Sequence, residues 1–534
     1  MLLEQGLASA SPFLLRPIFK SCFAAISNRA LSARHLFSAY LGLMKNVYLP
    51  TLLLAGALGA VPTFAQSVDD TRQLLRQRTE QQAVERGLQD NSFVKPAPQP
   101  HAPRAADQPQ RAEHSTSELG QTLYLSLQHR QWMMARSLLA EYLSLPDRDP
   151  LLVYYTQGLL ARADGQLGQA EYEFRALLAL QPWFLPARLE LARVLFESAQ
   201  DREAHRAFSD IDDFLGMAGA GAAGVRRTVA TYLDVLERRK AWRTSVSIGT
   251  RWSDNVNRTS ASRTCLVPAS HGLCLIERTV PEPIKAFGPE FSASTQRRFP
   301  LIGHHGFYVR AQTAGSWYRN DRDYNEASLA VEAGFSYRNA NHQITLAPTY
   351  SHHTWGKNSF YDSWGLSTGW RYTPSSHSLV TLEADYENMQ YRQQAYARYF
   401  NGPNRSLSAT YYRDVGVGWT LFGGLDAEGS RAKARIQSYL QQGVRLGASL
   451  QTHGFTGTAL ATLRQRSYRA YNPLLEARRR DNEQSYSFVI TSPRWSVAGF
   501  VPSLTLRHNK VRSNVGWLYS YDRNVVAVTM EYMI

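Results

Sequence analysis

The stretch Val380-Thr381-Leu382-Glu383-Ala384-Asp385-Tyr386 alternates apolar and polar residues at every position. Successive side chains of a β-strand point to opposite faces of the sheet, so this order gives a strand one apolar and one polar face. Similar alternation recurs at 307–313, 344–350, 504–507 and 526–534. The C-terminal half of the chain is therefore predicted to consist of strands that separate an apolar from a polar environment.

These segments are too long for an ordinary soluble β-sandwich. They run for about 10–13 residues, whereas strands of soluble sheets usually have five or six and membrane-spanning strands 9–11. Aromatic residues also gather at the segment ends, as the interfacial girdles of membrane barrels do. The girdle candidates are Trp317, Tyr318, Trp355, Trp370, Tyr372 and Tyr391.

Fourteen such strands are predicted between Trp242 and Ile534, at 242–252, 286–297, 304–317, 326–337, 342–352, 361–373, 378–390, 404–413, 416–427, 436–450, 454–467, 481–493, 501–511 and 519–533. An open sheet edge in lipid would leave unpaired backbone groups, so the strands must close. An even number allows antiparallel closure. Residues 241–534 are therefore predicted to form a 14-stranded antiparallel outer-membrane β-barrel of a Gram-negative bacterium.

The links between strands fall into two kinds. Short ones such as 339–341 are predicted to be periplasmic turns, and the longer polar links 253–285, 391–403 and 468–480 are predicted to face outside. Strands of outer-membrane proteins usually end on Phe or Trp, whereas this chain ends Tyr532-Met533-Ile534. That departure bears on assembly efficiency and not on the fold.

Residues 119–240 have a helical period and a hidden repeat. Small, aromatic and proline residues stand at tetratricopeptide positions, first as Gly158, Ala170, Phe174 and Pro182, and 34 residues later as Ala192, Ala204 and Phe208. The interval is the one this repeat requires. The small residues allow two helices to approach, and the phenylalanines fill the space between adjacent pairs. An unrelated helical bundle is the alternative. The predicted fold class is thus an N-terminal α-helical repeat domain followed by a transmembrane β-barrel.

The N-terminal region contains an export signal. Lys45 precedes an apolar run at 47–61, and small residues at Thr63 and Ala65 follow it. This order is that of a signal peptide spanning 44–65, with cleavage between Ala65 and Gln66. We therefore expect Met44 to be the true start and residues 1–43 to be an upstream extension of the reading frame, with a long presequence from Met1 as the alternative.

Residues 66–118 are polar and proline-rich, so they are predicted to be a disordered linker. Two of the three cysteines, Cys265 and Cys274, lie nine residues apart in one predicted loop. Export places them in an oxidising compartment, which favours a local disulfide.

Composition excludes several other classes. A mean hydropathy of −0.36 argues against a helical membrane protein. The net charge of +15 could indicate nucleic-acid binding. The strand pattern favours arginine-rich lumen and loops instead, and no nucleic-acid partner is predicted.

No catalytic or metal-binding pattern stands out. Gly365–Gly369 matches G-x-S-x-G around Ser367, but that motif needs a strand-to-helix turn and here lies inside a predicted strand. His304-His305 and His352-His353 are adjacent pairs, and neighbouring side chains on a strand point apart. No metal site, cofactor or enzymatic activity is predicted. A hydrolase embedded in the barrel, with Ser367 as its nucleophile, is kept as a further hypothesis.

Two local motifs resemble the surface lipoprotein assembly modulator (Slam) family. One is the junction at Tyr232-Leu233, Arg238 and Trp242, which runs into Gly249 and Ser253–Asn257. The other is the last pair of strands, from Pro502 through Arg512-Ser513-Asn514 to Tyr519–Asn524. The similarity covers about 120–534, and the domain order agrees with it. The motif Ser253–Asn257 is interpreted as a polar turn that closes the first strand, in preference to a site that contacts a transported protein.

The resemblance implies an outer-membrane translocator with its repeats in the periplasm. Its clients are surface lipoproteins or secreted haem- or metal-binding proteins, and its other expected partners are periplasmic chaperones, the barrel-assembly machinery and outer-membrane lipid. It implies no catalytic residues. The alternative is a polysaccharide exporter, which also joins such repeats to a barrel but usually carries more of them.

Overall fold

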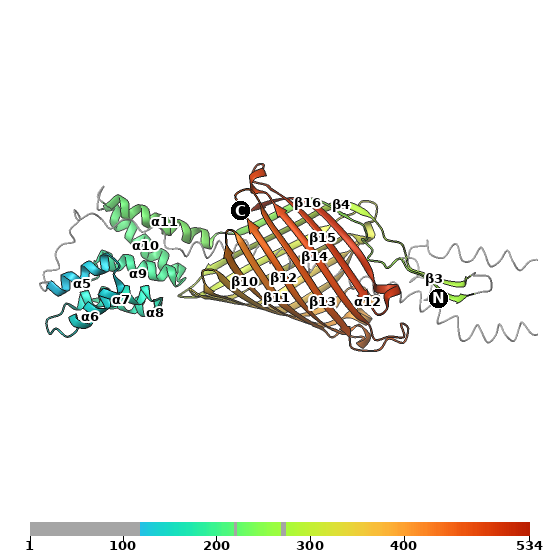
Figure 1. The fold of residues 1–534 in the computed structure, drawn as a ribbon, viewed down its shortest axis with the longest axis horizontal. Helices are drawn as coiled ribbons and strands as arrows, with labels where there is room; N and C mark the ends of the chain where they lie inside the picture. The colour runs from blue at the N-terminus through green and yellow to red at the C-terminus, as the bar shows by residue number, and fades with distance from the viewer. Residues whose placement is uncertain (1–117, 218–221, 269–273, 534) are drawn as a thin grey trace, which may run out of the picture. The chain divides into compact units, whose positions relative to one another are not determined.

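The computed structural model describes residues 118–217, 222–268 and 274–533. Within these residues, seven α-helices precede a closed barrel of fourteen strands (Figure 1). The predicted signal peptide, its cleavage position at Ala65 and Gln66, residues 1–43 and the linker up to residue 117 lie outside the described residues.

The helices follow one another with short connections. They are α5 (Glu118–Gln128), α6 (Trp132–Tyr142), α7 (Pro150–Ala163), α8 (Leu167–Leu180), α9 (Leu185–Glu197), α10 (Asp201–Met217) and α11 (Ala223–Lys240). The start of α7 shows why helices begin where they do. The Asp149 side chain accepts a hydrogen bond from the Leu151 amide at 2.8 Å, and Pro150 occupies the first helical position.

The first repeat packs around Phe174. Phe174 of α8 and Ala170 are completely buried. A Cβ atom added to Gly158 of α7 would lie 2.8 Å from the Phe174 ring, so only glycine allows this approach of α7 to α8. Pro182 is exposed in the turn between α8 and α9.

The second repeat places equivalent residues in equivalent positions. Ala192, Ala204 and Phe208 are completely buried between α9, α10 and α11. The Phe208 ring stacks on Tyr232 of α11 with centroids 4.6 Å apart. The closing helix therefore covers the second repeat as the next repeat would.

An ion-pair cluster links α7 to α9. Arg162 Nη1 lies 2.5 Å from Glu190 and Nη2 lies 2.6 Å from Glu197. Burial lowers the pKa of Arg162, but the hydrogen bond with Glu197 and the charge of Glu190 outweigh it and raise this pKa above its ordinary value. Arg162 is therefore permanently charged and fixes the spacing of two successive repeats.

The barrel strands follow in chain order and pair antiparallel with their neighbours. They are β1 (Arg243–Ser253), β4 (Ala286–Pro300), β5 (His305–Ser316), β6 (Glu326–Arg338), β7 (His342–Trp355), β8 (Asn358–Ser375), β9 (Ser378–Tyr391), β10 (Gly402–Gly416), β11 (Trp419–Ser430), β12 (Tyr439–Gln451), β13 (Thr456–Tyr468), β14 (Arg480–Thr491), β15 (Val501–Ser513) and β16 (Tyr521–Met533). The pairing of β1 with β16 closes the ring. The predicted fold class and strand number are confirmed.

The alternation quoted from β9 sorts its side chains as predicted. Leu382 and Tyr386 are 36% and 43% exposed on the outer wall. Asp385 between them lines the lumen. The outer wall is therefore apolar because lipid surrounds it, and the inner wall is polar.

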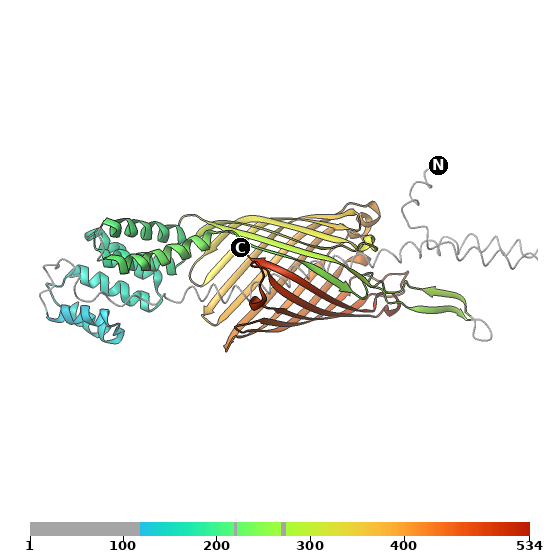
Figure 2. The same cartoon turned by 90° about the horizontal axis from the view of Figure 1, so that it is seen from above.

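The long links contain structure that the sequence pattern did not predict. The link 253–285 carries a hairpin of β2 (Arg263–Pro268) and β3 (Cys274–Thr279), which Figure 2 shows as a two-stranded ribbon beyond the barrel strands. The link 391–403 contains α12 (Gln394–Phe400), and α13 (Gly516–Tyr519) precedes β16. Tyr396 of α12 packs on Phe360 with ring centroids 5.1 Å apart, so a small aromatic core orders this loop.

Strand direction gives the barrel two distinct ends. The helix end is the one where β1 starts, three residues after Lys240, and the loop end is the other. The long links after β1, β9 and β13 all lie at the loop end, because these three strands run parallel to one another. Among the described helices, none is both long and apolar enough to cross a membrane.

Replacing Gly158 tests the packing of the first repeat. We expect Gly158→Val to destabilise the helical domain by about 1–3 kcal/mol, because the added methyl groups collide with Phe174. The control is Gly168→Ala in α8, where an added Cβ meets nothing within 4 Å. That change should be neutral or stabilising by up to about 1 kcal/mol. Thermal loss of the 222 nm circular dichroism signal of the purified full-length protein measures both, and equal melting curves would contradict the prediction.

Candidate functional site: the barrel lumen and its junction with the repeats

Side chains of β1 and of β4 to β13 surround a cavity of about 370 Å³. Its wall combines hydroxyl groups with charges of both signs. The charged lining residues on the strands are Arg243, Arg297, Arg298, Arg310, Glu332, Arg338, Arg371, Glu383, Asp385, Glu387, Asp426, Arg445 and Arg464. Such a wall is polar and carries charges of both signs.

A row of carboxylates follows the inner face of β9. Glu383, Asp385 and Glu387 lie at alternate positions, so all three face the lumen. Asp385 accepts hydrogen bonds from Ser367 of β8 at 2.7 Å and Ser406 of β10 at 3.0 Å. These serines stand directly opposite Asp385 in the register of the sheet, which is why they reach it.

Arginines balance other lumenal carboxylates. Arg310 Nη1 lies 2.7 Å from Glu332. Asp426 of β11 is 2.9 Å from Arg445 and 3.8 Å from Arg464, which come from the next two strands. Charges of both signs therefore line the cavity, unlike the single-sign rings that select small ions.

Ser367 does not occupy a nucleophile elbow. It lies inside β8, and its hydroxyl donates to Asp385 instead of a histidine. The strand-to-helix turn that G-x-S-x-G requires is therefore not present at Ser367.

His352 and His353 separate as expected for strand neighbours, whereas His304 lies just before β5 and packs with His305 against Tyr337. His352 hydrogen-bonds Asp362 at 2.6 Å, whereas His353 is buried against Tyr361. His304 Nδ1 lies 3.1 Å from the Arg338 carbonyl oxygen. In the described part of the chain, no three His, Cys, Asp or Glu side chains converge to bind a metal.

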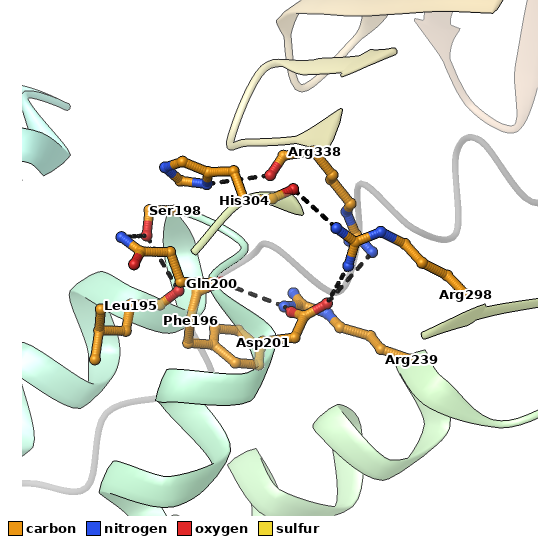
Figure 3. A network of polar contacts seen from close by, with 9 residues as sticks. All are labelled: Leu195, Phe196, Ser198, Gln200, Asp201, Arg239, Arg298, His304 and Arg338. Atoms are coloured by element: carbon orange, nitrogen blue, oxygen red, sulfur yellow. Dashed lines mark hydrogen bonds and ion pairs between the residues drawn. The ribbon is translucent and has the colours of Figure 1, made fainter. Parts of the chain in front are cut away.

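The junction between helices and barrel centres on Asp201, the first residue of α10. Its carboxylate is buried and accepts a hydrogen bond from Arg239 of α11 at 2.8 Å. Arg298 of β4 and Arg338 of β6 lie 3.7 and 3.8 Å from it. Figure 3 shows the three guanidinium groups facing this one carboxylate.

Further contacts hold the same arginines. Arg239 also donates to the Phe196 carbonyl at 3.2 Å and lies over the Phe196 ring at 4.0 Å. Arg298 donates to the His304 carbonyl at 2.9 Å. Glu203 of α10 accepts from the Gly303 amide in the turn after β4, at 3.0 Å.

The sequence did not indicate that Asp201, Arg298 and Arg338 would form this junction. An acidic residue at the start of a helix is ordinary, because it complements the helix dipole. Arg298 and Arg338 occupy inward positions of strands already predicted to carry lumenal arginines. Only the three-dimensional register brings these residues together.

The two exported cysteines come together in the hairpin. A disulfide joins Cys265 of β2 to Cys274 of β3. The base of the hairpin is held by Arg278, which lies over Trp517 at 3.5 Å, and by Ser262, whose hydroxyl donates to the Trp517 carbonyl at 2.6 Å.

The Ser253–Asn257 motif begins this loop. Asn255 donates to the carbonyls of Thr259 and Asp522 at 3.0 and 3.1 Å and accepts from the Thr259 amide. These contacts are those of a turn that fixes the end of β1 to β16. They favour the structural interpretation of the motif.

Neutralising Asp201 tests the junction. We expect Asp201→Asn to lower the stability of the helical domain by about 3 kcal/mol, because it leaves buried arginines without their carboxylate. It should also increase protease cleavage between α11 and β1. The control Asp212→Asn removes an exposed pair with Arg226 and should change neither property measurably. Equal effects of the two variants would show that Asp201 has no special role.

Removing the disulfide tests the hairpin. In the loop-closure model it contributes roughly 2–3 kcal/mol to the order of the segment it closes. We therefore expect Cys265→Ser/Cys274→Ser to increase the rate of trypsin cleavage at Arg263 and Arg278. The barrel should keep its heat-modifiable migration on gels. An unchanged cleavage rate would mean that the barrel contacts alone order the hairpin.

Comparison with known proteins agrees with this architecture. Residues 242–533 match the model of the family described as surface lipoprotein assembly modifier. Residues 107–208 match the model of the N-terminal TPR repeats of the same family.

Characterised relatives span most of the chain. The chain is 33% identical over 495 residues to a hemophilin secretion modulator of Acinetobacter baumannii, covering 90% of this chain and 99% of that protein. It is 24% identical to a surface lipoprotein assembly modifier of Pasteurella multocida, covering 72% of this chain and 76% of that protein. Surface lipoprotein assembly modifier 1 of Neisseria meningitidis is 24% identical, over 74% of this chain and 79% of its own length. The chain is an outer-membrane protein and belongs to the surface lipoprotein assembly modifier family.

Proposed function

We propose that this protein is a translocator that delivers a lipoprotein, or a secreted haem- or metal-binding protein, to the cell surface. The observation that carries the proposal is the direct attachment of a helical repeat array to a polar-walled barrel. Only Ala241 and Trp242 separate α11 from β1. Repeat arrays bind peptides and proteins, and the barrel offers a route across the outer membrane. The names of the relatives point to clients of these two kinds.

The lumen supports passage of an extended chain. A folded domain of 100 residues has a radius of gyration of about 13 Å, which a cavity of 370 Å³ cannot hold. An extended polypeptide exposes charges of both signs and backbone polar groups. The cavity is lined by carboxylates such as Glu383 and by arginines such as Arg371, which offer weak contacts to both kinds of charge.

One-way transport of the client needs an energy source other than nucleotide hydrolysis, because no nucleotide is present at the outer membrane. We infer that the client folds outside and thereby prevents its return. The repeats on the periplasmic side receive the client, together with periplasmic chaperones that keep it unfolded. The barrel-assembly machinery inserts the protein itself, and outer-membrane lipid surrounds it.

The alternative functions have less support. A polysaccharide exporter needs a strongly acidic and aromatic lumen. Here the carboxylates of β9 share the lumen with arginines, and the family match favours protein clients. A hydrolase would need Ser367 to act as a nucleophile, which its position in β8 disfavours.

Co-expression with a candidate client encoded beside this gene tests the proposal. Surface labelling of intact cells should detect the client when the gene is present and lose it when the gene is deleted. Restoring the gene should restore the signal. Unchanged surface exposure after deletion would overturn the proposed function.

Narrowing the lumen should block delivery. Ser408 of β10 faces the cavity, and the adjacent Ala409 faces lipid opposite Leu382 and Leu425. We expect Ser408→Trp to reduce the surface-exposed client several-fold. Ala409→Trp adds the same side chain to the outer wall and should leave delivery unchanged. Heat-modifiable migration confirms that both variants fold, and equal delivery by the two would exclude this part of the lumen from the route.

A further inference from the structure

Two neighbouring loops at the loop end of the barrel carry an unbalanced positive charge. The segments 392–401, between β9 and β10, and 431–438, between β11 and β12, contain no Asp or Glu. They contain five cationic residues, Arg392, Arg398, Arg431, Lys433 and Arg435, and all five are exposed. By contrast, the loop 317–325 balances Arg319 and Arg322 with Asp321 and Asp323.

Little inside the chain neutralises these charges. Arg392 forms an ion pair with Asp362. Within the described ranges, Arg398, Arg431, Lys433 and Arg435 have no carboxylate partner. Four exposed cations on two neighbouring loops, with no carboxylate among them, give this part of the surface a positive potential. Such a surface attracts an anionic partner.

The two loops form one ordered surface. The amides of Arg431 and Lys433 donate to the carbonyls of Pro403 and Asn401 at 2.9 and 2.7 Å. The Ala434 amide donates to the Tyr399 carbonyl of α12 at 3.0 Å. The aromatic core under α12 fixes the other side. The backbone positions of the cations are thus set before any ligand binds.

One more cation, Arg405, adds to the four unpaired loop cations and extends this surface onto the lipid-facing wall. Arg405 of β10 stands between Tyr386 of β9 and Gly429 of β11 in the register, and its guanidinium lies 5.7 Å from the centre of the Tyr386 ring. Tyr386 and the next outward residue, Leu407, are exposed on the outer wall. Gly429 leaves an open space beside Arg405, because a Cβ there would meet only Leu440 at 4.0 Å.

The depth of Arg405 identifies the kind of partner. It lies three residues after Gly402, the first residue of β10. At a strand rise of about 3.3 Å and a tilt near 45°, this is about 7 Å below the top of the strand. A cation on the lipid side at that depth faces the headgroup layer and requires an anion there. A soluble acidic protein would meet the loops but not this wall.

We propose that Arg398, Arg405, Arg431, Lys433 and Arg435 bind the phosphate groups of lipid A in the outer leaflet. The periplasmic location of the repeats places the loop end in that leaflet. Lipid A carries phosphates on a sugar headgroup at the membrane boundary. The arginine guanidinium matches phosphate oxygens with two parallel hydrogen bonds. This lipid site is separate from the lumen and does not depend on the client.

Native mass spectrometry of the detergent-solubilised full-length protein tests the site. The probes are bisphosphorylated lipid A, the same lipid A without phosphates, and phosphatidylglycerol. We expect the phosphorylated form to bind at least tenfold more tightly than the other two. Arg398→Gln/Arg405→Gln/Arg431→Gln/Arg435→Gln should remove this preference. Arg319→Gln/Arg322→Gln, in the balanced loop, should retain it, and heat-modifiable migration checks the fold of each variant.

Three results would overturn the assignment. Equal binding of phosphatidylglycerol would indicate a general attraction to anionic lipid. Equal loss in the Arg319/Arg322 variant would indicate diffuse charge with no defined site. Competition by a glutamate-rich peptide at concentrations similar to those of lipid A would indicate an acidic protein partner.

Discussion

The hydrogen bonding between β1 and β16 is the constraint on which the rest of the molecule depends. An unpaired backbone amide in lipid costs several kcal/mol, so a membrane sheet must close on itself. Closure runs over nine pairs, from Ser245 opposite Met533 to Ser253 opposite Val525. Gly249 allows the close approach, because a Cβ there would lie 2.0 Å from the Val528 carbonyl oxygen. Once β1 is fixed, the end from which α11 leaves is fixed as well.

The alternation of the strands could be read from the sequence because lipid imposes it position by position. Outward residues in the middle of a strand, such as Leu382, face the hydrocarbon and are apolar, so the period of two can be seen in the sequence. The repeat register was predictable for a similar reason. Gly158 and Phe174 form a contact within one pair of helices, and the same contact returns 34 residues later as Ala192 and Phe208.

The loops and the junction could not be read in that way, because their contacts join residues far apart in the chain. Helix α12 depends on Tyr396 meeting Phe360, which belongs to another strand. Asp201 looks like any acidic residue that begins a helix, and its arginines lie 38, 97 and 137 positions further on, at Arg239, Arg298 and Arg338. No local sequence pattern indicates that the Asp201 carboxylate lies close to all three arginines. The sequence predicted that arginines would line the lumen. Which arginine pairs with which carboxylate depends on the register between neighbouring strands, which the sequence pattern does not give.

The junction joins the repeats to the barrel through charged groups and not through an apolar interface. A hydrophobic contact between repeats and barrel would be insensitive to what the lumen contains. Asp201 instead binds Arg298 and Arg338, which also line the cavity. A charged segment of a client that enters the cavity therefore meets the same arginines that hold the repeats. An acidic segment competes with Asp201 for them, and a basic segment is attracted to Asp201. Asp201 thus joins the repeats to two side chains of the cavity wall.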